Sequence, residues 1–134
     1  MTPEKLISLA VEAMDKAYAP YSGCKVGAAL LCSDGTVYTG CNIENAAYSP
    51  TNCAERTAIF KAVSEGRRDF TAIAVCGGRD GKITGPFPPC GVCRQVLREF
   101  CKDDFPVYLA HKDGCKTLTL DDLLPYSFGE DSLK

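Results

Sequence analysis

The sequence lacks the features that would indicate a nucleic-acid-binding, membrane or secreted protein. Its 134 residues include 15 basic and 17 acidic side chains, a formal net charge of −2, whereas binding long nucleic acid usually needs a clustered basic excess. No apolar run approaches the roughly 18 residues that a membrane-spanning helix needs. The N-terminal segment mixes acidic with apolar residues and has no secretory cleavage pattern. We therefore expect a cytoplasmic protein that binds neither nucleic acid nor a membrane.

Histidine and tryptophan are also scarce, whereas cysteine is abundant. The chain has one histidine, no tryptophan and nine cysteines. A domain of this size buries roughly two-thirds of its unfolded surface, so it needs no disulfides for stability. Because the number of cysteines is odd and no export signal is present, we do not expect a disulfide scaffold. In a reducing cytosol, cysteines mostly pack as small apolar side chains or bind metal.

The hydrophobic pattern predicts one domain, residues 1–134, in which strands alternate with helices. Helices are expected from Thr2-Pro3 to about residue 17, at 52–65 and at 90–101, with a helical turn at 121–124. Strands are expected at 26–31, 36–41, 70–76, 106–110 and 116–120. A loop rich in glycine and proline is expected from Gly77 to Pro89. This order predicts an α/β fold, a three-layer α/β/α sandwich around a mixed sheet of about five strands.

Two cysteine-containing segments each stand at the predicted start of a helix, after an irregular loop. They are Asn52-Cys53-Ala54-Glu55-Arg56 and Pro88-Pro89-Cys90-Gly91-Val92-Cys93-Arg94. Cys90 and Cys93 lie one helical turn apart, so both sulfurs can face one ion, and Cys53 can supply a third ligand. Since no fourth ligand lies nearby, and His111 falls in a predicted turn, the pattern predicts a zinc ion that keeps one position open to water, as catalytic zinc sites do.

Glu55 is the natural proton carrier beside such a zinc ion. It can share a cleft with Cys53 only if Cys53 is the N-cap residue and Glu55 lies in the first turn of the helix. Three thiolates on Zn²⁺ leave a net negative charge, which weakens the metal as a Lewis acid. We expect Arg56, and also Arg94, to donate hydrogen bonds to the sulfurs and draw charge away from the metal.

Two other roles remain open for these cysteines at this point. The Cys90-x-x-Cys93 spacing alone is also typical of a redox dithiol, although that role would leave Cys53 and Glu55 unexplained. A purely structural zinc site is the other alternative, but such sites normally have four protein ligands.

Further segments between about residues 18 and 128 occur in an order that points to one family. They are Tyr21-Ser22, Val26-Gly27-Ala28-Ala29, the stretch GCNIENAAY at 40–48, Cys53-Ala54-Glu55-Arg56 and Cys93-Arg94-Gln95. Together they resemble the small homotetrameric zinc-dependent cytidine deaminases. The resemblance implies one cytidine deaminase-like catalytic domain with one zinc ion per subunit, acting in pyrimidine salvage. It also implies hydrolysis of cytidine and deoxycytidine to uridine and deoxyuridine with release of ammonia, with zinc-bound hydroxide attacking C4 and Glu55 relaying protons.

The resemblance also implies roles for residues that bind the nucleoside. Asn42 and Glu44 match residues that hold the ribose, and the backbone N–H of Ala54 matches a contact to the base carbonyl. An amide and a carboxylate are suitable partners for sugar hydroxyls.

Three more matches concern neighbouring subunits. Ala46 and Tyr48 match residues that contribute to a neighbouring subunit's site, and Phe128 matches an aromatic that stacks on the base from another subunit. The resemblance therefore implies a homotetramer with shared active sites. From the residues alone, Tyr48 and Phe128 would be ordinary surface or anchoring aromatics.

One position departs from the family. The family usually has phenylalanine beside the bound nucleoside where this chain has Cys24. We expect a smaller, more polarizable wall there, with weaker packing of the nucleoside and intact chemistry. The other five cysteines are expected to fill apolar positions: Cys32, Cys41, Cys76, Cys101 and Cys115.

Three other functions are alternatives to the deamination of cytidine. A relative could act on another aminopyrimidine nucleoside such as blasticidin S, but the run from Asn42 to Tyr48 favours cytidine. A base-flipping deaminase of RNA or DNA is disfavoured by the acidic balance and small size. A zinc-stabilised interaction module without catalysis would bind zinc and release no ammonia.

Overall fold

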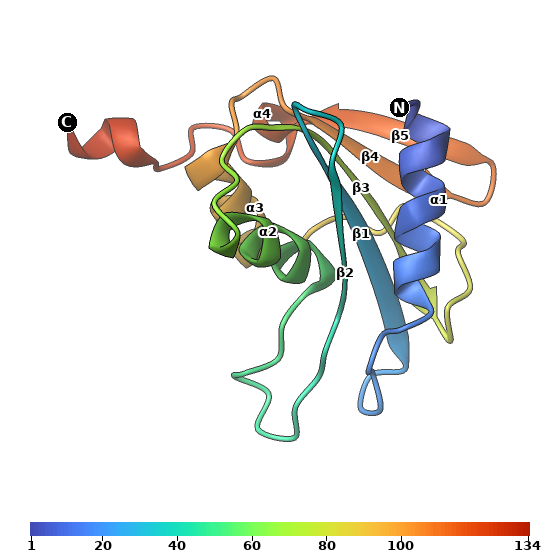
Figure 1. Ribbon diagram of the computed structural model, residues 1–134. Coiled ribbons are helices and arrows are strands. Elements are labelled where there is room, and N and C mark those ends of the chain that lie inside the picture. Colours follow the sequence, from blue (N-terminus) through green and yellow to red (C-terminus); the bar gives the residue numbers. More distant parts are fainter.

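A five-stranded mixed sheet forms the middle layer of the molecule, as the computed structural model of residues 1–134 shows (Figure 1). The strands lie in the order β2-β1-β3-β4-β5. Their bounds are Cys24–Cys32 (β1), Val37–Cys41 (β2), Phe70–Arg79 (β3), Pro106–His111 (β4) and Gly114–Thr119 (β5). Only β3 and β4 are parallel; the other neighbours are antiparallel. The predicted mixed sheet is confirmed.

Helices cover both faces of this sheet and complete the three predicted layers (Figure 1). Helix α1 (Pro3–Met14) covers one face, while α2 (Ala54–Ser64) and α3 (Gly91–Phe100) lie over the other. A short helix α4 (Leu120–Leu123) and a C-terminal 3-10 helix η1 (Glu130–Leu133) follow β5. None of the helices combines the length and the apolar character needed to cross a lipid bilayer.

The alternation of β1 divides the core in two. Val26, Ala28 and Leu30 pack with α2 and α3, whereas Ala29, from the other side of the strand, packs with α1. Such alternation follows from the two-residue period of a strand. The face that carries α2 and α3 is the one on which the candidate site lies.

Strand β3 is longer than the sequence predicts. We expected a loop from Gly77, but the strand continues through Gly77 and Gly78 to Arg79. A Cβ atom on Gly77 would lie 2.8 Å from Cδ1 of Phe87, and one on Gly78 would lie 1.9 Å from the carbonyl oxygen of Lys82. These glycines therefore permit close approach of another segment instead of ending the strand. Helix η1 was likewise not predicted.

Helix α2 lies unusually close to β2, at Gly40. A Cβ atom there would lie 2.5 Å from the carbonyl oxygen of Ala54 and 2.6 Å from the backbone nitrogen of Ala58. The absence of a side chain at Gly40 thus sets how near the first turn of α2 comes to the sheet.

We predict that Gly40→Ala lowers the free energy of unfolding by about 1–3 kcal/mol, because α2 has to move away from the sheet. Urea denaturation of the zinc-loaded protein measures this. Gly85→Ala is the matched control, because a Cβ at Gly85 meets no atom within 4 Å. Equal stability of the two variants would show that α2 does not depend on this close approach.

Candidate active site

Two helices begin at the centre of the candidate site, each with a cysteine as its N-cap residue. Cys53 precedes α2 and Cys90 precedes α3, both in extended backbone conformation. Neither sulfur caps its own helix by a hydrogen bond. The positive end of each helix dipole therefore lies beside a sulfur that is free to bind something else.

The sulfur atoms of Cys53, Cys90 and Cys93 converge. The Sγ–Sγ distance is 3.7 Å from Cys53 to Cys90 and 3.6 Å from Cys90 to Cys93, and all three atoms lie within 4.8 Å of one another. With Zn–S bonds of about 2.3 Å in a tetrahedron, two sulfurs on one zinc lie about 3.8 Å apart. The cluster is therefore suited to one zinc ion and leaves the fourth position open. His111 lies at the end of β4 and is not part of the cluster.

Glu55 occupies the first turn of α2, two residues after its N-cap, as the sequence predicts. Its side chain is almost fully buried, and it lines the same cavity as Cys53 and Cys90. Burial raises the pKa of Glu55 to about 7, and the charge on Cys53 adds to the shift. A carboxyl group with a pKa near neutrality can both accept and donate a proton.

The thiols of the cluster influence one another. The neighbouring Cys93 thiol has the largest lowering effect on the pKa of Cys53, which falls to about 5, and Arg56 and Cys90 lower it further. The pKa of Cys93 is raised in turn by Cys53 and by its own burial. Because zinc binds thiolates, loading of this site is expected to release the proton that Cys93 retains.

Of the two arginines expected near the sulfurs, only Arg56 reaches one. Its Nη2 donates to Sγ of Cys53 at 3.2 Å. Arg94 instead donates from Nε to the carbonyl oxygen of Pro89 (2.8 Å) and from Nη1 to that of Leu123 (2.7 Å). The prediction that Arg94 contacts the sulfurs is therefore wrong. Its side chain leans toward the N-terminus of α3, as helical side chains do, and there it meets the carbonyl before Cys90.

A cavity of about 220 Å³ opens in front of the sulfurs and Glu55. The predicted residues Cys24, Asn42 and Glu44 line it from β1 and from the segment after β2. It shares Ser22, Glu44 and Thr51 with a neighbouring cavity of about 330 Å³ that Tyr21 and Tyr48 also line. Sequence reasoning gave no site role to several other lining residues: Val26, Thr51, Asn52, Phe87 and Pro88.

Asn42 and Glu44 are both held by backbone groups. The Asn42 amide accepts from the N–H of Val26 and donates to the carbonyl of Cys24, both at 2.8 Å. The Glu44 carboxylate accepts from the backbone N–H groups of Tyr21 and Ser22 and from the Ser22 hydroxyl. The Ser22 hydroxyl has the largest lowering effect on the pKa of Glu44. Each side chain still has hydrogen-bonding capacity for a ligand, because an amide offers two donors and two lone pairs, and a carboxylate about four lone pairs.

The other predicted residues fall into two groups. Ala54 is buried as the first residue of α2, so its N–H has no partner within the helix. Ala46, Tyr48 and Phe128 are exposed. Ala46 and Tyr48 lie on the segment that projects below the sheet in Figure 1, and Phe128 lies on the C-terminal tail. Ala46 and Phe128 line neither cavity of their own chain.

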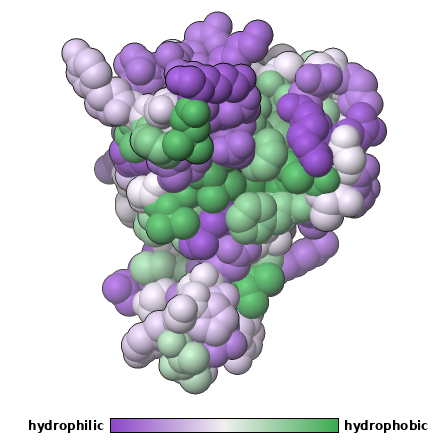
Figure 2. Space-filling model, turned by 90° about the vertical axis from the view of Figure 1, so that its left-hand side faces the viewer, coloured by the Kyte–Doolittle hydropathy of each residue, from purple (hydrophilic) through white to green (hydrophobic).

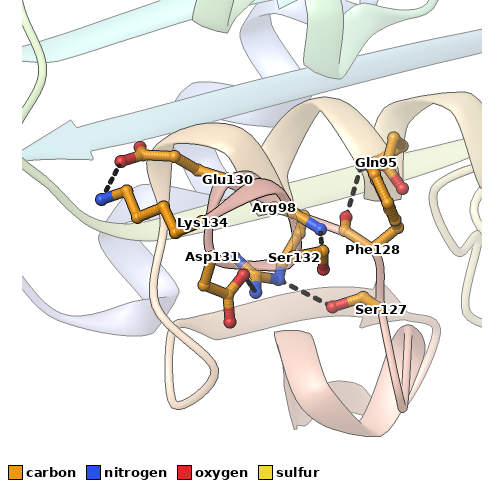
Figure 3. A network of polar contacts seen from close by, with 9 residues as sticks. Gln95, Arg98, Ser127, Phe128, Glu130, Asp131, Ser132 and Lys134 are labelled. Atoms are coloured by element: carbon orange, nitrogen blue, oxygen red, sulfur yellow. Dashed lines mark hydrogen bonds and ion pairs between the residues drawn. The ribbon is translucent and has the colours of Figure 1, made fainter.

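The tail that carries Phe128 is fastened to α3 by hydrogen bonds (Figure 3). The Gln95 amide donates to the carbonyl of Phe128 at 2.8 Å, and Arg98 donates to the Ser127 hydroxyl (2.7 Å) and to the Asp131 carboxylate (2.8 Å). The ring of Phe128 is therefore held outside the chain's own core at a defined position.

The sulfur cluster predicts a specific zinc stoichiometry. The unmodified protein should hold one zinc ion per chain, and Cys93→Ser should lose most of it, because a hydroxyl group is a poor replacement for a buried thiolate. Metal analysis of the dialysed proteins measures this. Cys115→Ser, a half-buried cysteine on β5, should retain the zinc ion. Full zinc content in Cys93→Ser would exclude Cys93 as a ligand.

Known proteins resemble this chain over nearly its whole length. The family of the cytidine and deoxycytidylate deaminase zinc-binding region matches residues 1–109. A cytidine deaminase of Sporosarcina psychrophila is 54% identical over 134 residues, covering 99% of this chain and 96% of that protein. One of Halalkalibacterium halodurans is 54% identical over 129 residues, covering 96% and 95%.

Solved structures agree with the sequence matches. The crystal structure of a cytidine deaminase from Burkholderia pseudomallei superposes with a TM-score of 0.89 at 49% identity, covering 96% of this chain and 100% of that one. That of Mycobacterium tuberculosis superposes with a TM-score of 0.81 at 39% identity, covering 96% and 98%. With the three-cysteine cluster and the full-length matches together, the chain belongs to the cytidine and deoxycytidylate deaminase family.

Proposed function

We propose that this protein is a zinc-dependent cytidine deaminase that converts cytidine and deoxycytidine, with water, to uridine and deoxyuridine and ammonia. The observation that carries the proposal is the buried carboxyl of Glu55 in one cavity with two of the three clustered cysteines. Cys53, Cys90 and Cys93 would hold the zinc ion, which would supply Lewis-acid activation of water. The chain's own groups then bind the nucleoside and move the protons.

Glu55 is the group that moves protons. Its near-neutral pKa suits it to take a proton from the attacking water, give it to N3 of the base, and pass a further proton to the departing amino group. Its place in the first turn of α2 keeps it beside Cys53. The buried position excludes bulk water that would compete for these protons.

Three groups position the nucleoside. The free N–H of Ala54, at the positive end of α2, is suited to the carbonyl oxygen of the base. Asn42 and Glu44 hold the sugar hydroxyls with the hydrogen-bonding capacity that their backbone contacts leave unused. Because those backbone contacts already fix both side chains, little rotamer entropy is lost when the sugar binds.

Arg56 tunes the zinc centre through its hydrogen bond to Cys53. It withdraws charge from the sulfur and so offsets the negative charge of three thiolates. Arg94 acts indirectly. Its hydrogen bonds to the carbonyl oxygens of Pro89 and Leu123 connect the backbone just before Cys90 to the end of α4.

The proposed function predicts that Glu55→Gln loses about 10²- to 10⁴-fold in kcat with cytidine, because the amide cannot relay protons. Formation of uridine and ammonia measures kcat, and unchanged zinc content shows that the site is intact. Glu12→Gln, an exposed carboxylate on α1, is the control and should keep full activity. Retained activity in Glu55→Gln would remove the proton relay, and zinc binding without any ammonia release by the unmodified chain would indicate a non-catalytic zinc module.

The active form is a homotetramer with shared sites, in this proposal. Supporting it, hydrophobic side chains gather on the face that carries α2 and α3 (Figure 2), where Phe60 and Val92 are exposed. Phe128 is 60% exposed and Tyr48 73% exposed, although both lie on segments fixed by hydrogen bonds. Fixed, exposed aromatics of this kind are typical of residues that enter a neighbouring subunit.

Light scattering should give the mass of four 14.4 kDa chains, and Phe128→Ala should raise KM for cytidine severalfold while the mass stays unchanged. Tyr126→Ala is the control: Tyr126 is an aromatic of the same tail that is even more exposed than Phe128, and its loss should leave KM unchanged. A fully active monomer would contradict the shared site.

A further inference from the structure

The cavity in front of the zinc ligands contains one aromatic side chain, and it is not at the position where the family has one. The ring belongs to Phe87, in the segment that leads into Cys90. Cys24, where the family usually has phenylalanine, lines the same cavity. Both positions therefore border the same space.

Strand register places them on the same face of the sheet. Val26 on β1 lies directly opposite Gly77 on β3, and Cys24 lies opposite Arg79, two pairs further along. Cys24 and Val26 are two residues apart, so their side chains point to the same face. Val26 packs with α2 and α3, which identifies that face as the one with the site.

Gly77 makes room for the ring of Phe87. A Cβ atom on Gly77 would lie 2.8 Å from Cδ1 and 2.9 Å from Cγ of Phe87. The ring therefore lies on bare backbone, beside Val26 and diagonally across from Cys24, and it also packs against the main core. A phenylalanine side chain at position 24 would extend from the same face toward the same space.

We propose that Phe87 is the aromatic wall against which the nucleoside packs in this protein, and that it replaces the ring absent from position 24. This inference rests on the proposed deaminase function. Two features leave space for the ring of Phe87 in the cavity: Cys24 has a small side chain, and Gly77 has none. The weaker nucleoside packing expected from Cys24 alone is offset by Phe87.

The test is a double-mutant cycle on KM for cytidine, with kcat and zinc content measured for every variant. Phe87→Val should raise KM about tenfold, the equivalent of about 1.4 kcal/mol, with kcat within about twofold. Cys24→Phe should also raise KM, because two rings compete for one space. The double variant Cys24→Phe/Phe87→Val should return KM to within about threefold of the unmodified protein.

Two further variants separate packing of the nucleoside from packing of the fold. Phe70→Val is the matched control, because Phe70, like Phe87, is half-buried against the main core. It lies at the start of β3, at the opposite end of the strand from Gly77. Its loss should lower stability without changing KM. Phe87→Leu keeps apolar volume without the ring, so it should fold and still raise KM.

The outcomes distinguish this inference from the function on which it rests. If the unmodified protein releases no ammonia from cytidine, the proposed function fails. If it does, but Phe87→Val and Phe87→Leu leave KM unchanged, Phe87 is not the wall. Additive effects of Cys24→Phe and Phe87→Val, with no recovery in the double variant, would show that the two positions do not share one space.

Discussion

The meeting of three cysteine sulfurs at the N-termini of α2 and α3 is the contact on which the rest of the site depends. Two of the sulfurs belong to N-cap residues, so the ends of both helices are fixed to one point above the sheet. Gly40 on β2 and the Arg94 contacts to Pro89 and Leu123 hold the two helices there. Once α2 begins at Cys53, the buried position of Glu55 follows from its place in the first turn.

The nine cysteines divide by environment. Cys53 and Cys90 are the N-cap residues of α2 and α3, and Cys93 lies in the first turn of α3. Away from this cluster, burial raises the pKa of Cys76 to about 11 and that of Cys101 to about 12. Cys32 is buried as well, as predicted, but Cys41 and Cys115 are only half-buried. A thiol with only apolar neighbours stays protonated and inert. Cys93 is buried as well, but it lies beside the other two sulfurs, where binding of zinc would displace its proton.

Local patterns predicted the features that depend on sequence spacing. The mixed sheet, the N-cap position of Cys53 and the convergence of the three cysteines followed from periodicity, from helix-start signals and from the requirements of zinc. Features set by contacts between distant segments could not be predicted in this way. The glycines of β3 resemble a loop until Phe87 and Lys82 are seen packed against them.

The direction of the Arg94 side chain and the proposed role of Phe87 are also set by contacts between distant segments. Both depend on which carbonyl or bare backbone the fold brings within reach, and no local pattern encodes that. The homology to cytidine deaminases indicates the reaction, while the structure shows which of this chain's residues line the cavity beside the cysteine cluster.

The central claim is that deamination depends on one zinc ion held by the three cysteines. The most direct measurement is uridine formation from cytidine by the same preparation before chelation, after removal of zinc, and after one equivalent of zinc per chain is returned. The account predicts activity, loss of activity and recovery, in that order. Undiminished uridine formation by protein shown by metal analysis to contain no zinc would contradict it.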